Sequence, residues 1–355
     1  MFRNGSQSRS ARVYFFQLVS LFCCAGVSAQ SQNPAPQAAM GRISLDVVVT
    51  KKNGPPISGL QQQDFTIVDN QAPQTIASFQ AIDGKQVPTE VILVVDDVNT
   101  GIERVAFERS EIDKILKADG GQLTQPMALA FLTDSGIQLQ EVFMTDGNAL
   151  SVSLHQYKLG LHTVLRTGGV YSTEERFRLS LDAMFELATH ETARPGRKLI
   201  IWVSPGWPLF SGPGAEQQMD AKQQQGIFND VVRLSGLLRQ ARATVYSADP
   251  LGDADFAGRA FRWEAFTKGL AKPKDADYGH LALQVVAAHS GGLVMTTSND
   301  LAGEIRRSID DSNAYYEISF VPPLGDQPHQ YHQLQVKVGQ AGLTARTRQG
   351  YYSQP

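Results

Sequence analysis

Cysteine is nearly absent from this sequence of 355 residues, and its scarcity excludes several classes of site. The two cysteines are Cys23 and Cys24, both in an N-terminal segment that we expect to be removed. The remaining chain would then have no disulfide and no thiolate metal site. A lipid anchor is disfavoured because bulky Phe22 precedes Cys23, where a lipoprotein site needs a small residue.

Long apolar runs are also scarce, and the main candidate lies at the N-terminus. Three arginines and no acidic residue precede the apolar run Val13–Val27, which has the length of a signal-peptide core rather than of a transmembrane helix. Small residues end this segment at Ala29. We expect a signal peptide at residues 1–29, a disordered linker at residues 30–39, and export to the periplasm, the cell envelope or the medium, with no transmembrane span in the mature chain.

A surplus of positive charge is missing as well. The formal net charge is −3 at pH 7, and loss of the three arginines in residues 1–29 would make it −6. Nucleic acid and anionic membrane surfaces are therefore not expected as partners. Gly-Lys-Ser/Thr phosphate loops and Gly-x-Gly-x-x-Gly fingerprints are also absent, so nothing in the sequence points to nucleotide binding.

Buried strands and amphipathic helices alternate through the middle of the chain. The continuous apolar runs Val91–Val95 and Lys198–Val203 are typical of parallel strands that are covered on both faces. The other expected strands are Met127–Leu132, Ile137–Phe143 at an edge, Thr244–Ser247 and Leu293–Met295, and the expected helices are Ile102–Ala118, Glu174–Ala188, Gln217–Ala241, Tyr278–His289 and Asp300–Ser312. This alternation predicts an α/β fold with a doubly wound, mostly parallel sheet over residues 88–313.

Both ends of the chain have a different texture, with short alternating strands separated by Gly, Asn and Pro. The expected strands are Ile43–Val49, Asp64–Val68, Thr75–Gln80, Tyr315–Val321, Leu334–Val338 and Leu343–Gln349. Because chain termini commonly lie close together, we expect residues 40–87 and 314–355 to pair into one β-sandwich. The α/β domain would then be an insertion between the two halves of that sandwich.

Four separated stretches carry a resemblance to a known family. They are Val47–Asn70, Val91–Thr100, Ser290–Phe320, and Gln335–Val338 with Arg346–Tyr352. Together they resemble the von Willebrand factor type A-related family described from acidobacteria, whose members are uncharacterised exported proteins. The resemblance implies a type A-like fold, and type A domains typically bind Mg²⁺ or Ca²⁺ at the carboxyl edge of the sheet.

The resemblance also assigns the positions of that metal site. Asp96 stands at the first aspartate position and Thr100 at the second hydroxyl position, but Val98 stands at the first hydroxyl position and offers no ligand atom. The threonine of the second loop is Thr167 or Thr173.

One further metal-site position differs. After the strand Lys198–Val203, Pro205 stands where the family has its second carboxylate. We therefore expect a degenerate site with no cofactor, in which Asp96 caps a helix or accepts hydrogen bonds from loop amides. Residual binding of Mg²⁺ or Ca²⁺ at Asp96, Thr100 and Thr167 is the alternative.

No catalytic constellation is recognised, and we expect the protein not to be an enzyme. Ser204 lies in Trp-Val-Ser-Pro-Gly, which lacks the first glycine of a nucleophile elbow, and the following proline has no N–H for an oxyanion hole. The expected function is an exported protein-binding, adhesion-type or scaffold module that acts through the loops at the carboxyl edge; a cation-dependent adhesion domain is the alternative. The candidate partner-binding residues are Asp97, Asn99, Ser204, Trp207 and Phe210.

Overall fold

A computed structural model of the chain describes residues 41–52, 54–157, 170–208, 219–250, 263–296, 300–323 and 327–354. The expected signal peptide and linker lie outside the described residues, as do Thr167 and Phe210. Residues Gly41–Pro355 belong to one unit. Within the described ranges, no helix combines the length and the apolar character that crossing a bilayer requires.

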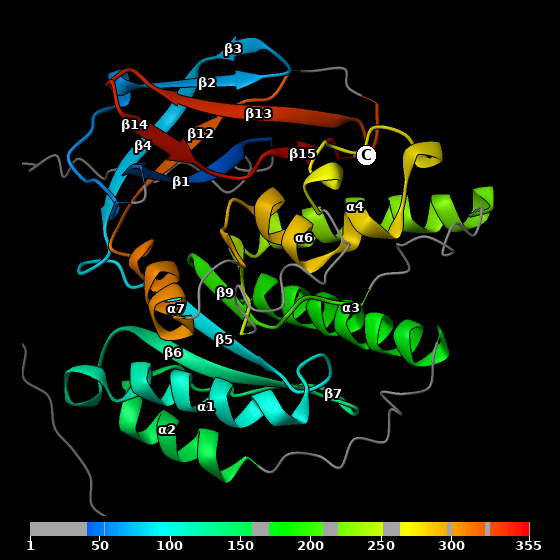
Figure 1. The fold of residues 1–355 in the computed structure, drawn as a ribbon. Helices are drawn as coiled ribbons and strands as arrows, with labels where there is room; N and C mark the ends of the chain where they lie inside the picture. Colours follow the sequence, from blue (N-terminus) through cyan, green and yellow to red (C-terminus); the bar gives the residue numbers. More distant parts are fainter. Residues whose placement is uncertain are drawn as a thin grey trace, which may run out of the picture. The chain divides into compact units, whose positions relative to one another are not determined.

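A seven-stranded sheet occupies the centre of the α/β part (Figure 1). Its strands are β5 (Glu90–Asp96), β6 (Gln122–Thr133), β7 (Gly136–Leu139), β8 (Met144–Asp146), β9 (Lys198–Val203), β10 (Ala243–Ala248) and β11 (Val294–Met295). The order is β11-β10-β9-β5-β6-β7, and β8 also pairs with β6. Pairing is parallel from β11 to β6 and antiparallel for β7 and β8. The mostly parallel sheet expected from the sequence is confirmed.

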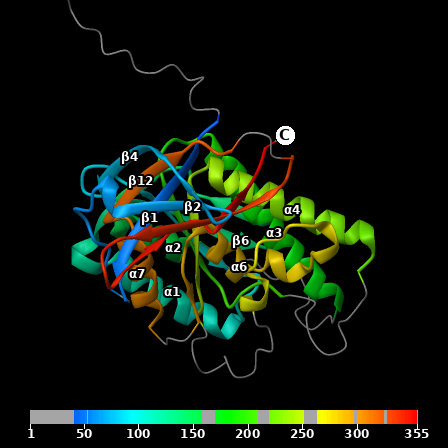
Figure 2. The ribbon, with the colours of Figure 1, turned by 90° about the horizontal axis from the view of Figure 1, so that it is seen from above.

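Helices cover both faces of this sheet. They are α1 (Ile102–Leu116), α2 (Gly147–Gln156), α3 (Val170–Thr192), α4 (Ala221–Gln240), α6 (Leu283–Ser290) and α7 (Leu301–Asp310). Successive residues of β5 point to opposite faces. Ile92 and Val94 therefore pack with α3, α4 and α6, whereas Leu93 and Val95 pack with α1, α2 and α7. Figure 2 shows α3 and α4 running side by side over their face.

Both ends of the chain meet in two four-stranded antiparallel sheets, which we call the terminal β unit. Its strands are β1 (Ile43–Lys51), β2 (Phe65–Asp69), β3 (Ala72–Gln74), β4 (Ile76–Asp83), β12 (Ala314–Phe320), β13 (Tyr331–Val338), β14 (Leu343–Arg346) and β15 (Gly350–Tyr352). The sheet orders are β14-β1-β12-β4 and β15-β13-β2-β3. Leu45 and Tyr316 of the first sheet share one apolar core with Ile67 and Val336 of the second. Strands from the two chain ends alternate in the first sheet, and in the second sheet β13 from the C-terminal end pairs with β2 from the N-terminal end.

Partly buried ion pairs join the terminal β unit to the α/β part. Arg242, just before β10, donates to Asp46 of β1 at 2.5 Å and also contacts Glu317 of β12. Asp311, after α7, pairs with Arg346 of β14 and also accepts from the Tyr246 hydroxyl of β10 at 2.6 Å.

Two helices depart from the sequence-based expectation. The expected helix over residues 278–289 is interrupted at Ala282, whose ψ of 143° is extended, so that a 3₁₀ turn at Tyr278–Leu281 precedes α6. Helix α2 was not expected from the pattern, and Asp146 caps it by accepting a hydrogen bond of 3.0 Å from the Ala149 amide.

Candidate functional site

The carboxyl ends of β5, β9 and β10 lie at one edge of the central sheet because these strands run parallel. In an open α/β sheet this edge is where ligands commonly bind. Asp96 is the last residue of β5, Ser204 follows β9, and Asp249 follows β10. All three are buried, at 0 to 2% of their accessible surface.

Four hydrogen-bond donors converge on the carboxylate of Asp96. Oδ1 accepts from the amides of Val98 at 3.1 Å and Asn99 at 2.9 Å. Oδ2 accepts from the Asn99 side-chain amide at 2.8 Å and from the indole Nε1 of Trp202 at 3.0 Å. A carboxylate has about four lone-pair sites, so these donors satisfy the whole group.

Val98 and Trp202 close the space that a cation at Asp96 would need. The Val98 side chain is 2% exposed and belongs to the apolar core beneath α3 and α4. Trp202 lies in β9, the neighbour of β5, and its ring is fully buried. An indole N–H only donates, so Trp202 offers a hydrogen atom where a cation would require a ligand oxygen.

Asn99 and Asp97 connect this carboxylate to the surrounding elements. The Asn99 side-chain amide also donates to Ser180 Oγ of α3 at 2.8 Å. Asp97, which is 1% exposed, points to the other side and lies 3.6 Å from the Arg109 guanidinium of α1. The two consecutive aspartates therefore face different partners.

Glu108 is a buried acid of this site that the sequence analysis did not single out. It lies on α1 with no exposed surface. Burial raises its pKa well above the usual value, and the nearby Asp96 and Asp97 raise it further, whereas Thr100 and Arg109 act in the opposite direction. These causes favour the neutral form of Glu108, and a carboxyl group that keeps its proton is a poor ligand for Mg²⁺ or Ca²⁺.

The spacing of residues in the sequence could have identified Glu108 as an inward-facing residue of α1. Val105, Glu108 and Ile112 are three and four residues apart, which places them on one face of a helix. Val105 and Ile112 are buried, and Glu108 follows them to the inside. An acid at an inward position of a predicted helix is the pattern that identifies it.

Contacts among its own residues stabilise the turn after β9. Gly206 donates its amide to Ser204 Oγ at 3.2 Å and has a φ of 104°, a left-handed conformation that favours glycine. Trp207 is 4% exposed and packs edge-to-face on Trp202 with ring centroids 5.4 Å apart. Ser204, Trp207 and Asp97 are thus buried and support the loops from beneath; contact of these residues with a partner stays a prediction.

The donor set at Asp96 does not fit a bound cation. Thr100 is buried near Glu108, and its amide donates to the Asp96 carbonyl at 3.2 Å. Across the described ranges, no group of three His, Cys, Asp or Glu side chains is arranged to hold a metal ion. The Asp96 carboxylate holds the loop after β5 in place and binds Trp202 of β9. Asn99 extends this network to Ser180 of α3.

Comparison with known proteins gives structural neighbours only. No protein-family model and no curated protein sequence matches the chain. The SpRpn10 VWA domain is similar at 11% identity and a TM-score of 0.32, over 63% of this chain and 97% of that one. The TFIIH p34 N-terminal domain is similar at 10% identity and a TM-score of 0.32, over 64% and 99%.

A third neighbour is longer than this chain. The pilus adhesin SpaC from Lactobacillus rhamnosus GG is similar at 9% identity and a TM-score of 0.37, over 85% of this chain and 50% of the adhesin. At these TM-scores the likenesses carry no argument about the site. Its interpretation rests on the geometry around Asp96.

Proposed function

We propose that this chain is an exported, non-enzymatic binding or scaffold module, of the adhesion type, that contacts a protein partner through the loops at the carboxyl edge of its central sheet. In this proposal no cation takes part. The observation that carries it is the Asp96 carboxylate, whose four acceptor positions are used by Val98, Asn99 and Trp202. The loop after β5 is thus fixed by the protein itself.

The wider assignment rests on the sequence. The resemblance to the type A-related family, the expected signal peptide and the net charge of −6 after its loss favour an exported module over a nucleic-acid-binding protein. We interpret the terminal β unit as the β-sandwich that frames the module. The degenerate metal site would be a type A site in which hydrogen-bond donors have replaced the cation.

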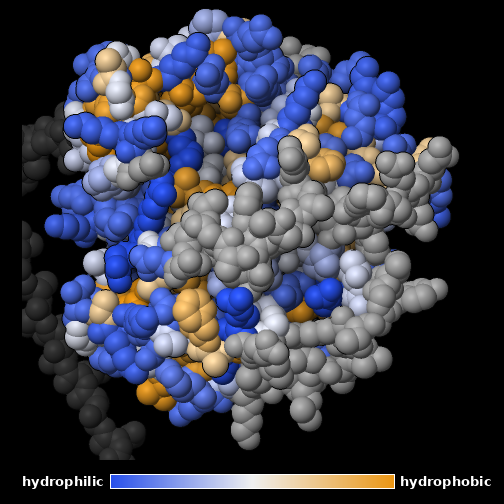
Figure 3. All heavy atoms as spheres, in the orientation of Figure 1, coloured by the Kyte–Doolittle hydropathy of each residue, from blue (hydrophilic) through white to orange (hydrophobic). Residues whose placement is uncertain are grey.

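The described surface favours specific loops over a broad apolar face as the contact. On the face seen in Figure 3, the described residues are mostly hydrophilic, and hydrophobic residues form separate spots. The exposed large apolar side chains are Val87, Phe107, Val142, Val152 and Val321. Scattered single residues of this kind are ordinary for a protein surface.

The test is partner capture from an envelope extract with and without divalent cations. A bulky side chain at Gly101, an exposed position with open space around it, should block a partner at this edge. Gly226 on α4 also has open space around it, so Gly226→Arg is the matched control. We expect the same partner in EDTA and in Mg²⁺, lost with Gly101→Arg and kept with Gly226→Arg.

Two results would count against the proposal. Capture that is unchanged in Gly101→Arg would move the contact away from this edge. Capture that occurs only with Mg²⁺ or Ca²⁺, and that Asp96→Asn abolishes, would favour the alternative, a cation-dependent adhesion domain.

A further inference from the structure

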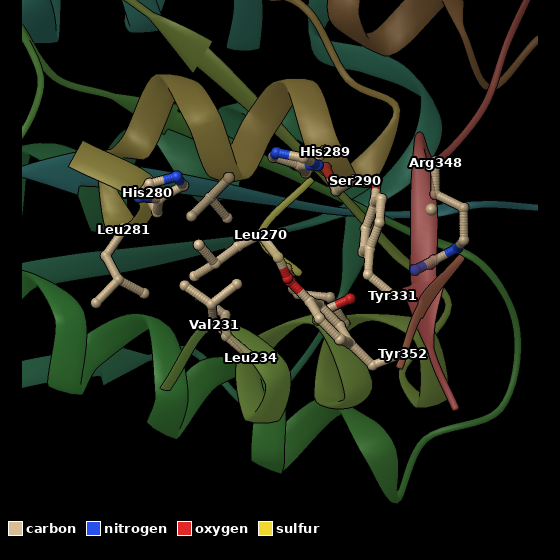
Figure 4. Close-up of a pocket in the computed structure, with 14 residues that line it drawn as sticks. Val231, Leu234, Leu270, His280, Leu281, His289, Ser290, Tyr331, Arg348 and Tyr352 are labelled. Carbon is tan, nitrogen blue, oxygen red and sulfur yellow. The ribbon is translucent and has the colours of Figure 1, made fainter. Parts of the chain in front are cut away.

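A cavity lies between α4 and α6, away from the Asp96 loop, where the terminal β unit closes one end (Figure 4). Its volume is about 50 Å³. One water molecule needs about 10–15 Å³ measured in this way, so the space exceeds a single water several times over. Its walls come from residues far apart in the sequence, which meet only in the folded chain.

Most of the wall is apolar. Val231 and Leu234 of α4, Leu281 before α6, and Leu270 line it. Several polar groups of the wall already make hydrogen bonds within the protein. The Tyr352 hydroxyl donates to the Leu270 carbonyl at 3.0 Å.

Two further polar groups are also occupied. The Tyr331 hydroxyl donates to the Gln349 carbonyl at 3.3 Å. Ser290 Oγ accepts from the Val245 amide at 2.8 Å and donates to the Ala287 carbonyl at 2.9 Å. The cavity therefore offers a ligand mainly apolar contact along this part of the wall.

Tight packing fixes the end of the cavity at Tyr331. A methyl group added at Gly269 would come within 1.9 Å of the Tyr331 ring, and one added at Gly350 within 2.3 Å of its hydroxyl oxygen. The ring is thus held between two glycines. A side chain larger than hydrogen at either position would displace the ring from this wall.

Arg348 forms the same end, and it is the arginine of a lining that also includes the imidazoles of His280 and His289 (Figure 4). It is 8% exposed, and its guanidinium has no hydrogen bond or ion pair with any residue that the structure describes. A buried cation without a partner is unfavourable, and buried charges in proteins are normally paired. An anion bound in the cavity would supply the partner that the Arg348 guanidinium lacks.

Nearby charged side chains do not supply that anion. Asp46 attracts Arg348 from a distance, but its carboxylate is bound by Arg242. Arg239 of α4 adds a second positive charge, and in the described part of the chain it also has no carboxylate partner. Burial, and then Arg239, lower the pKa of Arg348 to about 10.

We propose that this cavity binds a small carboxylate with a compact apolar body. Its carboxylate lies against the Arg348 guanidinium, and its apolar body extends past the rings of Tyr331 and Tyr352 toward Val231 and Leu234. The fork of a guanidinium matches the two oxygens of a carboxylate, and hydrogen bonds between charged groups are stronger than neutral ones. The site is separate from the carboxyl-edge loops and does not depend on the proposed function.

The experiment is a calorimetric titration of the full chain with butanoate, pentanoate, hexanoate and benzoate, each beside its neutral amide. We expect saturable binding of at least one carboxylate, weaker by about tenfold or more for the matching amide. Arg348→Met should weaken binding to the same degree, because methionine keeps an apolar stem but has no charge. Arg178→Met is the matched control, since Arg178 lies on α3 with an 81% exposed side chain.

A second variant keeps the proposal open to refutation if Arg348→Met does not fold. Val231→Phe narrows the cavity without touching the arginine, and we expect it to exclude the larger carboxylates. The proposal is overturned if no carboxylate of the series binds saturably, if each amide binds as well as its acid, or if folded Arg348→Met binds like the wild type. Unchanged binding to folded Val231→Phe would also overturn it.

Discussion

The indole N–H of Trp202 donates a hydrogen bond of 3.0 Å to Oδ2 of Asp96. The two residues lie on neighbouring parallel strands that are more than one hundred positions apart in the chain. The bond occupies a lone-pair position of the Asp96 carboxylate that a cation would need. Asp96 is thus a structural acceptor that fixes the loop after β5.

Loss of this single donor should be measurable in Trp202→Phe. The substitution keeps a buried aromatic ring and removes the N–H, so one acceptor of a buried carboxylate is left without its partner. We expect the free energy of unfolding to fall by about 1–3 kcal/mol, measured by chemical denaturation.

Trp207 provides the matched control for Trp202. Its ring packs on the same cluster, but its Nε1 is buried without an acceptor in the described part of the chain. Trp207→Phe should therefore cost less than Trp202→Phe, because no hydrogen bond is lost. Equal losses in the two variants would mean that ring volume, rather than the bond to Asp96, sets the effect.

Glu108→Gln should stabilise the protein at neutral pH. The folded state raises the pKa of Glu108, so its contribution to stability is present below the unfolded pKa of about 4.5 and declines as the pH rises through the folded value. Glutamine keeps the shape and cannot ionise. We expect a gain on the order of 1 kcal/mol at neutral pH that shrinks in acid, measured by denaturation across the pH range.

The exposed Glu141 is the control for Glu108. Glu141→Gln should leave the pH profile of unfolding nearly unchanged. A Glu108→Gln variant that is less stable than the wild type at every pH would show that Glu108 acts as a charged partner and not as a buried neutral acid.

His289 should make the protein sensitive to acid. Burial and, to a smaller extent, the neighbouring His280 lower the pKa of His289 to about 4, whereas a hydrogen bond to the Phe266 backbone acts in the opposite direction. Its contribution is present above the ordinary value of 6.5 and is lost as the pH falls through 4. In His289→Gln we expect the loss of unfolding free energy over this window to be smaller by about 3 kcal/mol. His155→Gln, at a side chain that is 58% exposed, should give the wild-type profile, and identical profiles for all three proteins would refute the assignment.

Two central strands of the sheet were predictable because each is a continuous apolar run, whereas the short edge strand β8 was not expected. Val91–Val95 and Lys198–Val203 lie within β5 and β9. Their order in the sheet was not predictable, since β5 and β9 become neighbours only after three intervening strands fold elsewhere. For the same reason the bond from Trp202 to Asp96 leaves no trace in the sequence, where Trp202 is simply one apolar residue of a buried strand.

The sequence predicted where the candidate site residues lie along the chain, but it did not predict that their side chains are buried. Asp97, Ser204 and Trp207 follow buried strands, as expected, yet their side chains turn inward. Arg348 was not singled out, because a single arginine near a chain end is normally exposed. Its burial depends on the packing of β15 against α4 and α6, which pairs residues from distant parts of the chain.

The central claim is that Asp96 serves the protein's own hydrogen bonds, and the free energy of unfolding with and without a divalent cation tests it most directly. The account predicts the same value for the wild type in EDTA and in millimolar Mg²⁺ or Ca²⁺. It also predicts that Asp96→Ala lowers this value by about 2–4 kcal/mol in either condition, because buried donors lose their acceptor. A wild type that gains about 1 kcal/mol or more from the cation, with the gain abolished in Asp96→Asn, would contradict it.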